Sequence, residues 1–92
     1  MNAQQFMELR EHIEEYALQH GVEAHLTIDD LEGSDVNPPG QRICVHVIRR
    51  IDGQPPREHP HTAAGYRPEV PDLKVRLERA VRDAALALYK EP

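Results

Sequence analysis

The spacing of apolar residues changes period twice along this chain of 92 residues, and no other sequence feature limits the fold as much. From about Ala3 to His20, apolar residues recur every three or four positions, as on one face of a helix. From Val22 to Ile28 they alternate with polar residues, which predicts a strand with one buried face. Helical spacing returns from about Asp72 to Lys90. The pattern predicts a helix at each end of the chain and strands between them.

Residues at the ends of these segments support the same boundaries. Asn2 is a suitable N-cap for the first helix, and Gly21 follows that helix where a left-handed C-cap residue is common. Pro71 and Asp72 suit the start of the last helix. We therefore expect the first helix to end just before Gly21.

The middle of the chain predicts two further strands. Residues Arg42 to Ile51 alternate, with Ile43, Val45 and Val47 facing inward. Asp52-Gly53 then favours a tight hairpin turn, because both central positions of that turn need positive φ. A third strand is predicted from about Arg57 to Arg67. Prolines, which lack a backbone donor, confine this segment to an edge of the sheet: Pro55, Pro56 and Pro60.

The element order predicts a single α+β domain over residues 1–92. The simplest packing is two-layered: a three-stranded antiparallel meander with both helices on one face. With one Phe, three Tyr and no Trp, the chain has few large side chains for its core. A homodimer interface would supplement such a thin core, so we expect a homodimer.

Charge is unevenly distributed along the chain, whose net charge is −5. Residues 1–41 carry nine acidic residues and one base, whereas residues 42–92 carry ten bases and seven acidic residues. The overall acidity argues against general affinity for nucleic acid. The asymmetry predicts either a polar surface for a protein partner or an electrostatic attraction between the two halves, within one subunit or between subunits.

The single cysteine and the lengths of the apolar runs indicate the cellular compartment of the protein. One cysteine, Cys44, excludes an intramolecular disulfide and suits a reducing environment. The N-terminal residues do not resemble a signal peptide, and no apolar run approaches the roughly 20 residues that span a membrane. We therefore expect a cytoplasmic protein without membrane contact.

One face of the predicted sheet gathers metal-ligand residues if the turns fix the strand register. A tight turn at Asp52-Gly53 places His46 opposite His59 and Cys44 opposite His61. Symmetric closure of the first loop places His25 opposite His46 and Thr27 opposite Cys44. Imidazole and thiolate together suit zinc, copper or nickel. The candidate transition-metal ligands are His25, His46, His59, His61 and Cys44. The alternative is an ordinary solvent-facing side of an antiparallel sheet, with no cofactor.

Four basic residues along the first half of the last helix are candidates for binding a partner or a nucleic acid: Lys74, Arg76, Arg79 and Arg82. Their charge also matters for a resemblance between this chain and a known protein family. The helix, three strands and helix resemble a double-stranded-RNA-binding domain, as does the loop Asn37-Pro38-Pro39-Gly40 before a strand. The last helix is similar to that family's alanine-rich helix in Arg79, Ala80, Ala84, Ala85 and Leu88.

The resemblance implies recognition of duplex RNA by shape and by phosphate contacts. The chain departs from the family at the charged positions. The paired lysines that open the family's last helix are missing, with only Lys74 and Arg76 near that place, and the first loop lacks the family's histidine. The first helix carries four glutamates where the family meets the minor groove. These charges predict that duplex RNA does not bind.

Signs of catalysis are weak in the sequence. Cys44 lies in the middle of a strand rather than at a helix N-terminus, Ser34 lies in an acidic loop, and the glycines do not form a phosphate-binding loop. We therefore expect a non-enzymatic, homodimeric binding or interaction domain that acts through its polar sheet face or its basic second half. The alternatives are a double-stranded-RNA-binding-like protein and a metal-binding protein.

Overall fold

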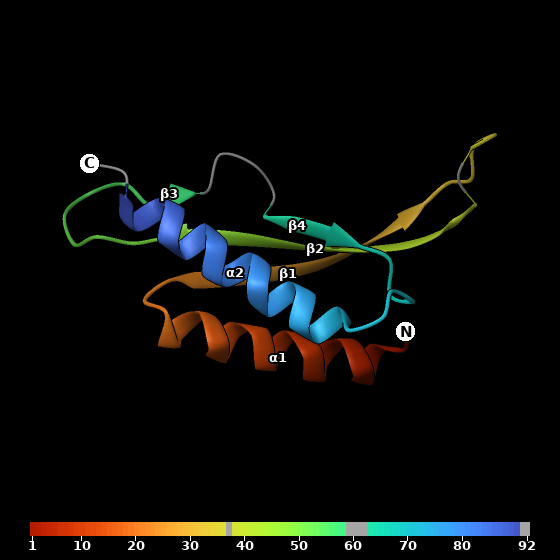
Figure 1. Ribbon diagram of the computed structural model, residues 1–92, viewed down its shortest axis with the longest axis horizontal. Coiled ribbons are helices and arrows are strands. Elements are labelled where there is room, and N and C mark those ends of the chain that lie inside the picture. The colour runs from red at the N-terminus through yellow and green to blue at the C-terminus, as the bar shows by residue number, and fades with distance from the viewer. Residues whose placement is uncertain (37, 59–62, 91–92) are drawn as a thin grey trace.

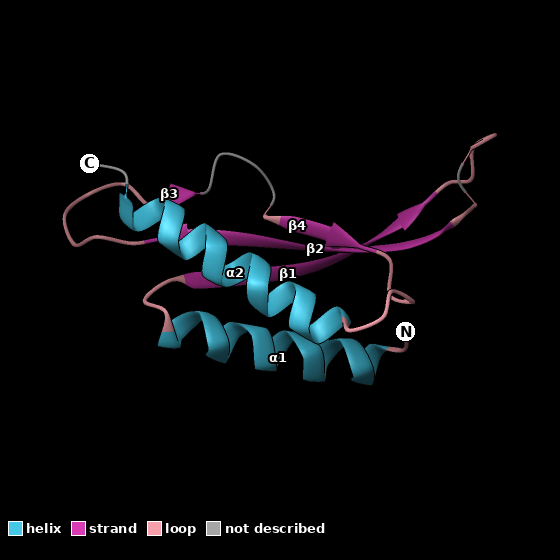
Figure 2. Ribbon diagram, viewed as in Figure 1, coloured by secondary structure: helices cyan, strands magenta, loops and turns pink. Residues whose placement is uncertain are grey.

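The computed structural model describes residues 1–36, 38–58 and 63–90, and its elements follow the predicted order (Figures 1 and 2). The helices and strands are α1 (Ala3–Gln19), β1 (Glu23–Leu31), β2 (Gly40–Arg49), β3 (Arg57–Glu58), β4 (Ala64–Tyr66) and α2 (Leu73–Lys90). In the sheet, β2 is central: β1 pairs with one side of it, and both β3 and β4 pair antiparallel with the other. The predicted α+β class is confirmed.

Both ends of α1 are fixed by the residues that the sequence indicates. The side chain of Asn2 accepts a hydrogen bond from the Gln5 N–H, and the Gln5 side chain accepts one from the Asn2 N–H, which forms a capping box. At the other end, the N–H of Val22 donates to Ala17 O and the N–H of Gly21 donates to Leu18 O. This is a Schellman motif, and it needs the φ of 74° that Gly21 adopts.

The β1–β2 hairpin has the predicted register and is longer than predicted. His25 lies opposite His46 and Thr27 opposite Cys44, as expected. Pairing continues past the predicted ends to Leu31 opposite Gly40. Asp29 faces Arg42, as symmetric closure of the first loop also predicts, and opposite charges across a strand pair are favourable. The end of the hairpin therefore projects beyond the helices, and the molecule measures 45 × 27 × 20 Å (Figure 1).

The predicted third strand is replaced by two short strands, and its predicted register is wrong by at least one residue. Arg57 faces Arg49 in β3, and Gly65 faces Cys44 in β4, so Cys44 does not lie opposite His61. The turn explains the first shift. The predicted turn needs positive φ at both Asp52 and Gly53. Gly53 has a φ of 77°, but Asp52 is not among the described residues with positive φ, so the turn is of another type. Turns with only the second central φ positive splay the strands, so pairing starts later.

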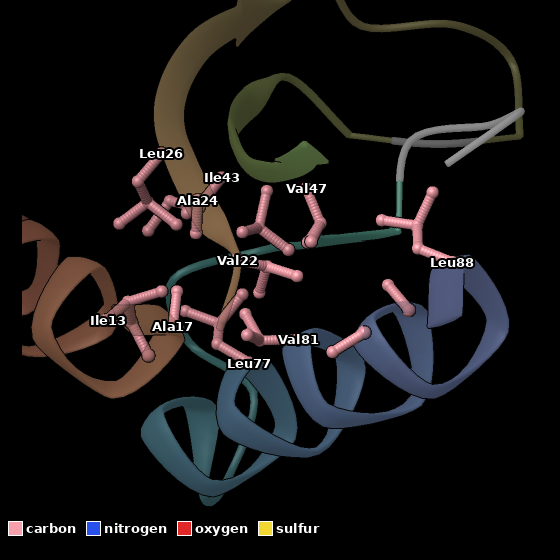
Figure 3. Close-up of a cluster of buried hydrophobic side chains, with 13 residues drawn as sticks. Ile13, Ala17, Val22, Ala24, Leu26, Ile43, Val47, Leu77, Val81 and Leu88 are labelled. Carbon is pink, nitrogen blue, oxygen red and sulfur yellow. The ribbon is translucent and has the colours of Figure 1, made fainter. Parts of the chain in front are cut away.

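The core lies between the sheet and the two helices, which cover one face (Figure 3). Val45 and Val47 point into it from β2, as predicted, together with Ile13 of α1 and Leu77 and Leu88 of α2, and at most 1% of any of these side chains is exposed. Each such aliphatic side chain contributes roughly 1.5–3 kcal/mol on burial. The core is aliphatic throughout, and the large aromatic side chains lie only at its margin.

Candidate functional site

The sheet face opposite the helices carries part of the predicted metal set. His25 and His46 are exposed and face each other, and Cys44 is a free cysteine with 6% of its surface exposed. His59 and His61 lie outside the described residues. Across residues 1–36, 38–58 and 63–90, no three histidines, cysteines or acidic residues lie close enough together to hold a metal ion. A metal site that also uses His59 and His61 stays a prediction.

The four basic residues of α2 border three different hollows. Arg76 and Arg79 line a cleft between α2 and β4. Arg79 also borders a smaller hollow with Arg82 and with Tyr16 of α1. Lys74 lies on the other side of the helix, in a hollow that contains Glu8 and His12 of α1. Arg79 is thus shared by two hollows, whereas Lys74 lies apart from the other three basic residues.

The cleft between α2 and β4, here called the α2–β4 cleft, has a volume of about 420 Å³. Small side chains create it: Ala80 and Ala84 are one turn apart on α2, and Ala63 precedes β4. Larger side chains at these positions would fill the space between helix and strand. Tyr66 of β4 and Val75 of α2 add apolar surface to the walls. The volume is in the range that holds a small ligand or a few residues of a peptide.

Arg76 is held in place within this cleft. Its Nε donates to Pro71 O at 2.9 Å, and its guanidinium lies 5.9 Å from the centre of the Tyr66 ring. The backbone bond uses one of the five guanidinium N–H groups, and the ring contact is a weak cation–π interaction. The remaining N–H groups of Arg76 have no partner among the described residues, and the two contacts favour one orientation of the guanidinium before a ligand binds.

The arginines of the cleft are not neutralised by carboxylates in the part of the chain that the structure describes. Its ion pairs involve Arg10, His12, Arg50 and Arg82, and neither Arg76 nor Arg79 has a carboxylate oxygen within 4.0 Å. Two acidic residues also line the cleft. Asp83 lies 3.9 Å from Arg82, and Asp72 directly precedes α2, where the helix dipole favours a negative charge. Asp83 thus has a compensating charge in Arg82, whereas Asp72 has only the partial positive charge of the helix N-terminus.

The sequence indicates the charges of this site but not its shape. Arg76 and Arg79 were candidates on charge alone, whereas Tyr66 and the alanines were not. The signal for the alanines is weak: Ala80 and Ala84 share a helix side with Arg76, where a larger apolar residue would otherwise pack. Those small residues line a cleft only because β4 lies beside α2.

Comparisons with known proteins leave this cleft as the main guide to function. No known protein family matches the chain, and neither a curated protein nor a solved structure resembling it was found. In the described residues, neither helix combines the length and the apolar character that crossing a membrane requires.

Proposed function

We propose that this protein is a non-enzymatic binding domain whose α2–β4 cleft recognises an acidic polypeptide segment. The observation that carries the proposal is the pair Arg76 and Arg79, without carboxylate partners in the described chain, on the wall of a cleft floored by alanines. Carboxylates of a ligand would accept charge-assisted hydrogen bonds from the two guanidinium groups. An apolar side chain of the same ligand would contact Val75 and the alanines.

A peptide fits this cleft better than a free anion does, for two reasons. Arg76 and Arg79 line the cleft together with Val75, Ala80 and Ala84, so a ligand that presents both carboxylates and apolar side chains matches it better than an anion alone. In addition, β4 pairs with β2 on one side only, and no strand of the described chain pairs with its other side. Strand edges beside a helix are a common place for an extended peptide to bind.

The test is binding of a fluorescent probe peptide of alternating aspartate and valine, measured by anisotropy with dilute protein. We expect salt-sensitive binding. In the variant R76Q/R79Q, affinity should fall roughly tenfold or more, since two charge-assisted bonds are lost. A80L should also weaken binding, because the added leucine fills the cleft without changing its charge.

The matched control is K74Q. Lys74 lies on the same helix and is exposed, but it borders a different hollow and does not line the cleft. The control should bind the probe within about twofold of the wild type, as a single exposed charge outside the site contributes little. Equal loss of binding in K74Q and R76Q/R79Q would mean that the probe responds only to the general charge of α2, and the proposal would then be wrong.

A further inference from the structure

A second feature of the molecule is complementary to the α2–β4 cleft. The projecting end of the β1–β2 hairpin, here called the acidic arm, consists of residues 29–36 and 38–42 (Figure 1). It carries four exposed carboxylates against one arginine, Arg42: Asp29, Asp30, Glu32 and Asp35. Next to Asp35, the side chain of Val36 is 87% exposed. The arm therefore offers the charge and the apolar side chain that the cleft suits.

The arm is held in shape before it meets any partner. Arg67, which directly follows β4, donates from Nη2 to Pro38 O at 2.8 Å. The two sides of the loop lie in close contact, since a Cβ on Gly33 would come within 2.9 Å of Pro39 Cδ. Val36 N donates to Ser34 Oγ at 3.3 Å, which forms a local turn at the end of the arm. A preorganised segment loses less conformational entropy on binding than a free chain does.

The arm of one molecule cannot serve its own cleft. It points away from α2 and lies beyond the end of the helical layer (Figure 1). We infer that the acidic arm of a second copy of this chain occupies the α2–β4 cleft, with Asp35 near Arg76 and Arg79 and Val36 against the alanine floor. This inference rests on the proposed function, because it names the acidic segment that the cleft takes. Two copies that exchange arms about a two-fold axis fill both clefts.

The other acidic surface of the chain, on α1, fits the cleft less well. Its glutamates lie on a convex helix, whereas the arm is a narrow projection that can enter a concave site. Glu11 and Glu15 are exposed and can be reversed in charge without touching the arm. They therefore provide a matched control for the charge change in the arm.

Sedimentation of the full chain at high micromolar concentration and low salt tests the inference. We expect wild-type protein at about twice the 10.5 kDa of one chain, with dissociation at 1 M salt, where charges are screened beyond about 3 Å. The arm variant E32K/D35K and the cleft variant R76E/R79E should each be monomeric. An equimolar mixture of the two variants should again be dimeric, because each arm then meets a cleft of opposite charge. The control E11K/E15K should remain dimeric.

Three outcomes would overturn the inference: wild-type protein that is monomeric at low salt, an arm variant that dimerises as the wild type does, or two variants that stay monomeric when mixed. Loss of the dimer in E11K/E15K but not in E32K/D35K would assign the contact to α1 instead. These failures are distinguishable from failure of the proposed function. A monomeric wild type that still binds the aspartate–valine probe through Arg76 and Arg79 would leave the cleft as a binding site for a different acidic partner.

Discussion

At the scale of single residues, substitutions on the two faces of β2 test the strand register most clearly. Val45 is fully buried against the helices, and the adjacent His46 is exposed on the opposite face. An aspartate in place of Val45 would place a charge in an aliphatic core where none of the described residues is a buried base. The same aspartate in place of His46 would lie in water.

The variant V45D should therefore unfold, with a loss of more than about 4 kcal/mol in the free energy of unfolding. H46D should lose about 1 kcal/mol or less, which reflects the low strand propensity of aspartate. Thermal unfolding followed by circular dichroism compares the two variants under the same conditions. Similar melting temperatures for V45D and wild type would contradict the observed register.

The β1–β2 register could be predicted in two steps. The alternation of apolar residues fixes which face is buried, since a slip by one residue would expose every apolar side chain, and symmetric closure of the first loop then selects this pairing. The same reasoning fails after Ile51. The prolines and polar residues there do not alternate, so the sequence has no pattern that fixes where pairing resumes. The predicted meeting of Cys44 with His61 depended on that register, and Cys44 instead faces Gly65.

At the scale of elements, one cluster joins the C-terminal end of α2 to the rest of the fold. The guanidinium of Arg49 lies 4.1 Å from the centre of the Tyr89 ring, and its Nη1 donates to Leu88 O at 3.1 Å. The hydroxyl of Tyr89 donates to Gly21 O at 2.8 Å, in the turn between α1 and β1. A cation beside the last carbonyls of a helix also interacts favourably with its dipole.

Removal of this cluster should cost more than removal of a surface ion pair. R49Q should lower the free energy of unfolding by about 2 kcal/mol, since the ring contact and a charge-assisted bond are both lost. R50Q removes only the exposed pair with Glu23 and should cost less than about 1 kcal/mol. Urea unfolding at one pH measures both variants. Equal stability of R49Q and R50Q would show that the Arg49 contacts do not hold α2 in place.

At the scale of the whole molecule, the uneven charge of the sequence becomes two separate surfaces. The acidic half forms α1 and the projecting hairpin, and the basic half supplies the helix that lines the cleft. Charge alone predicted an attraction between halves, but the sequence does not indicate which acidic segment projects or which basic residues share a concave site. Those two facts depend on the length of the hairpin ladder and on the small side chains beside β4.

The measurement that tests the binding site most directly is a titration of isotope-labelled protein with the aspartate–valine probe, followed through its backbone amide resonances by NMR. The protein should be dilute enough to stay monomeric. We predict that the perturbed amides cluster in residues 63–66 and 72–84, around the α2–β4 cleft, and that the shifts are largely absent in A80L. Perturbations centred on His25 and His46, on the opposite face of the sheet, would contradict the proposal that the α2–β4 cleft is the binding site.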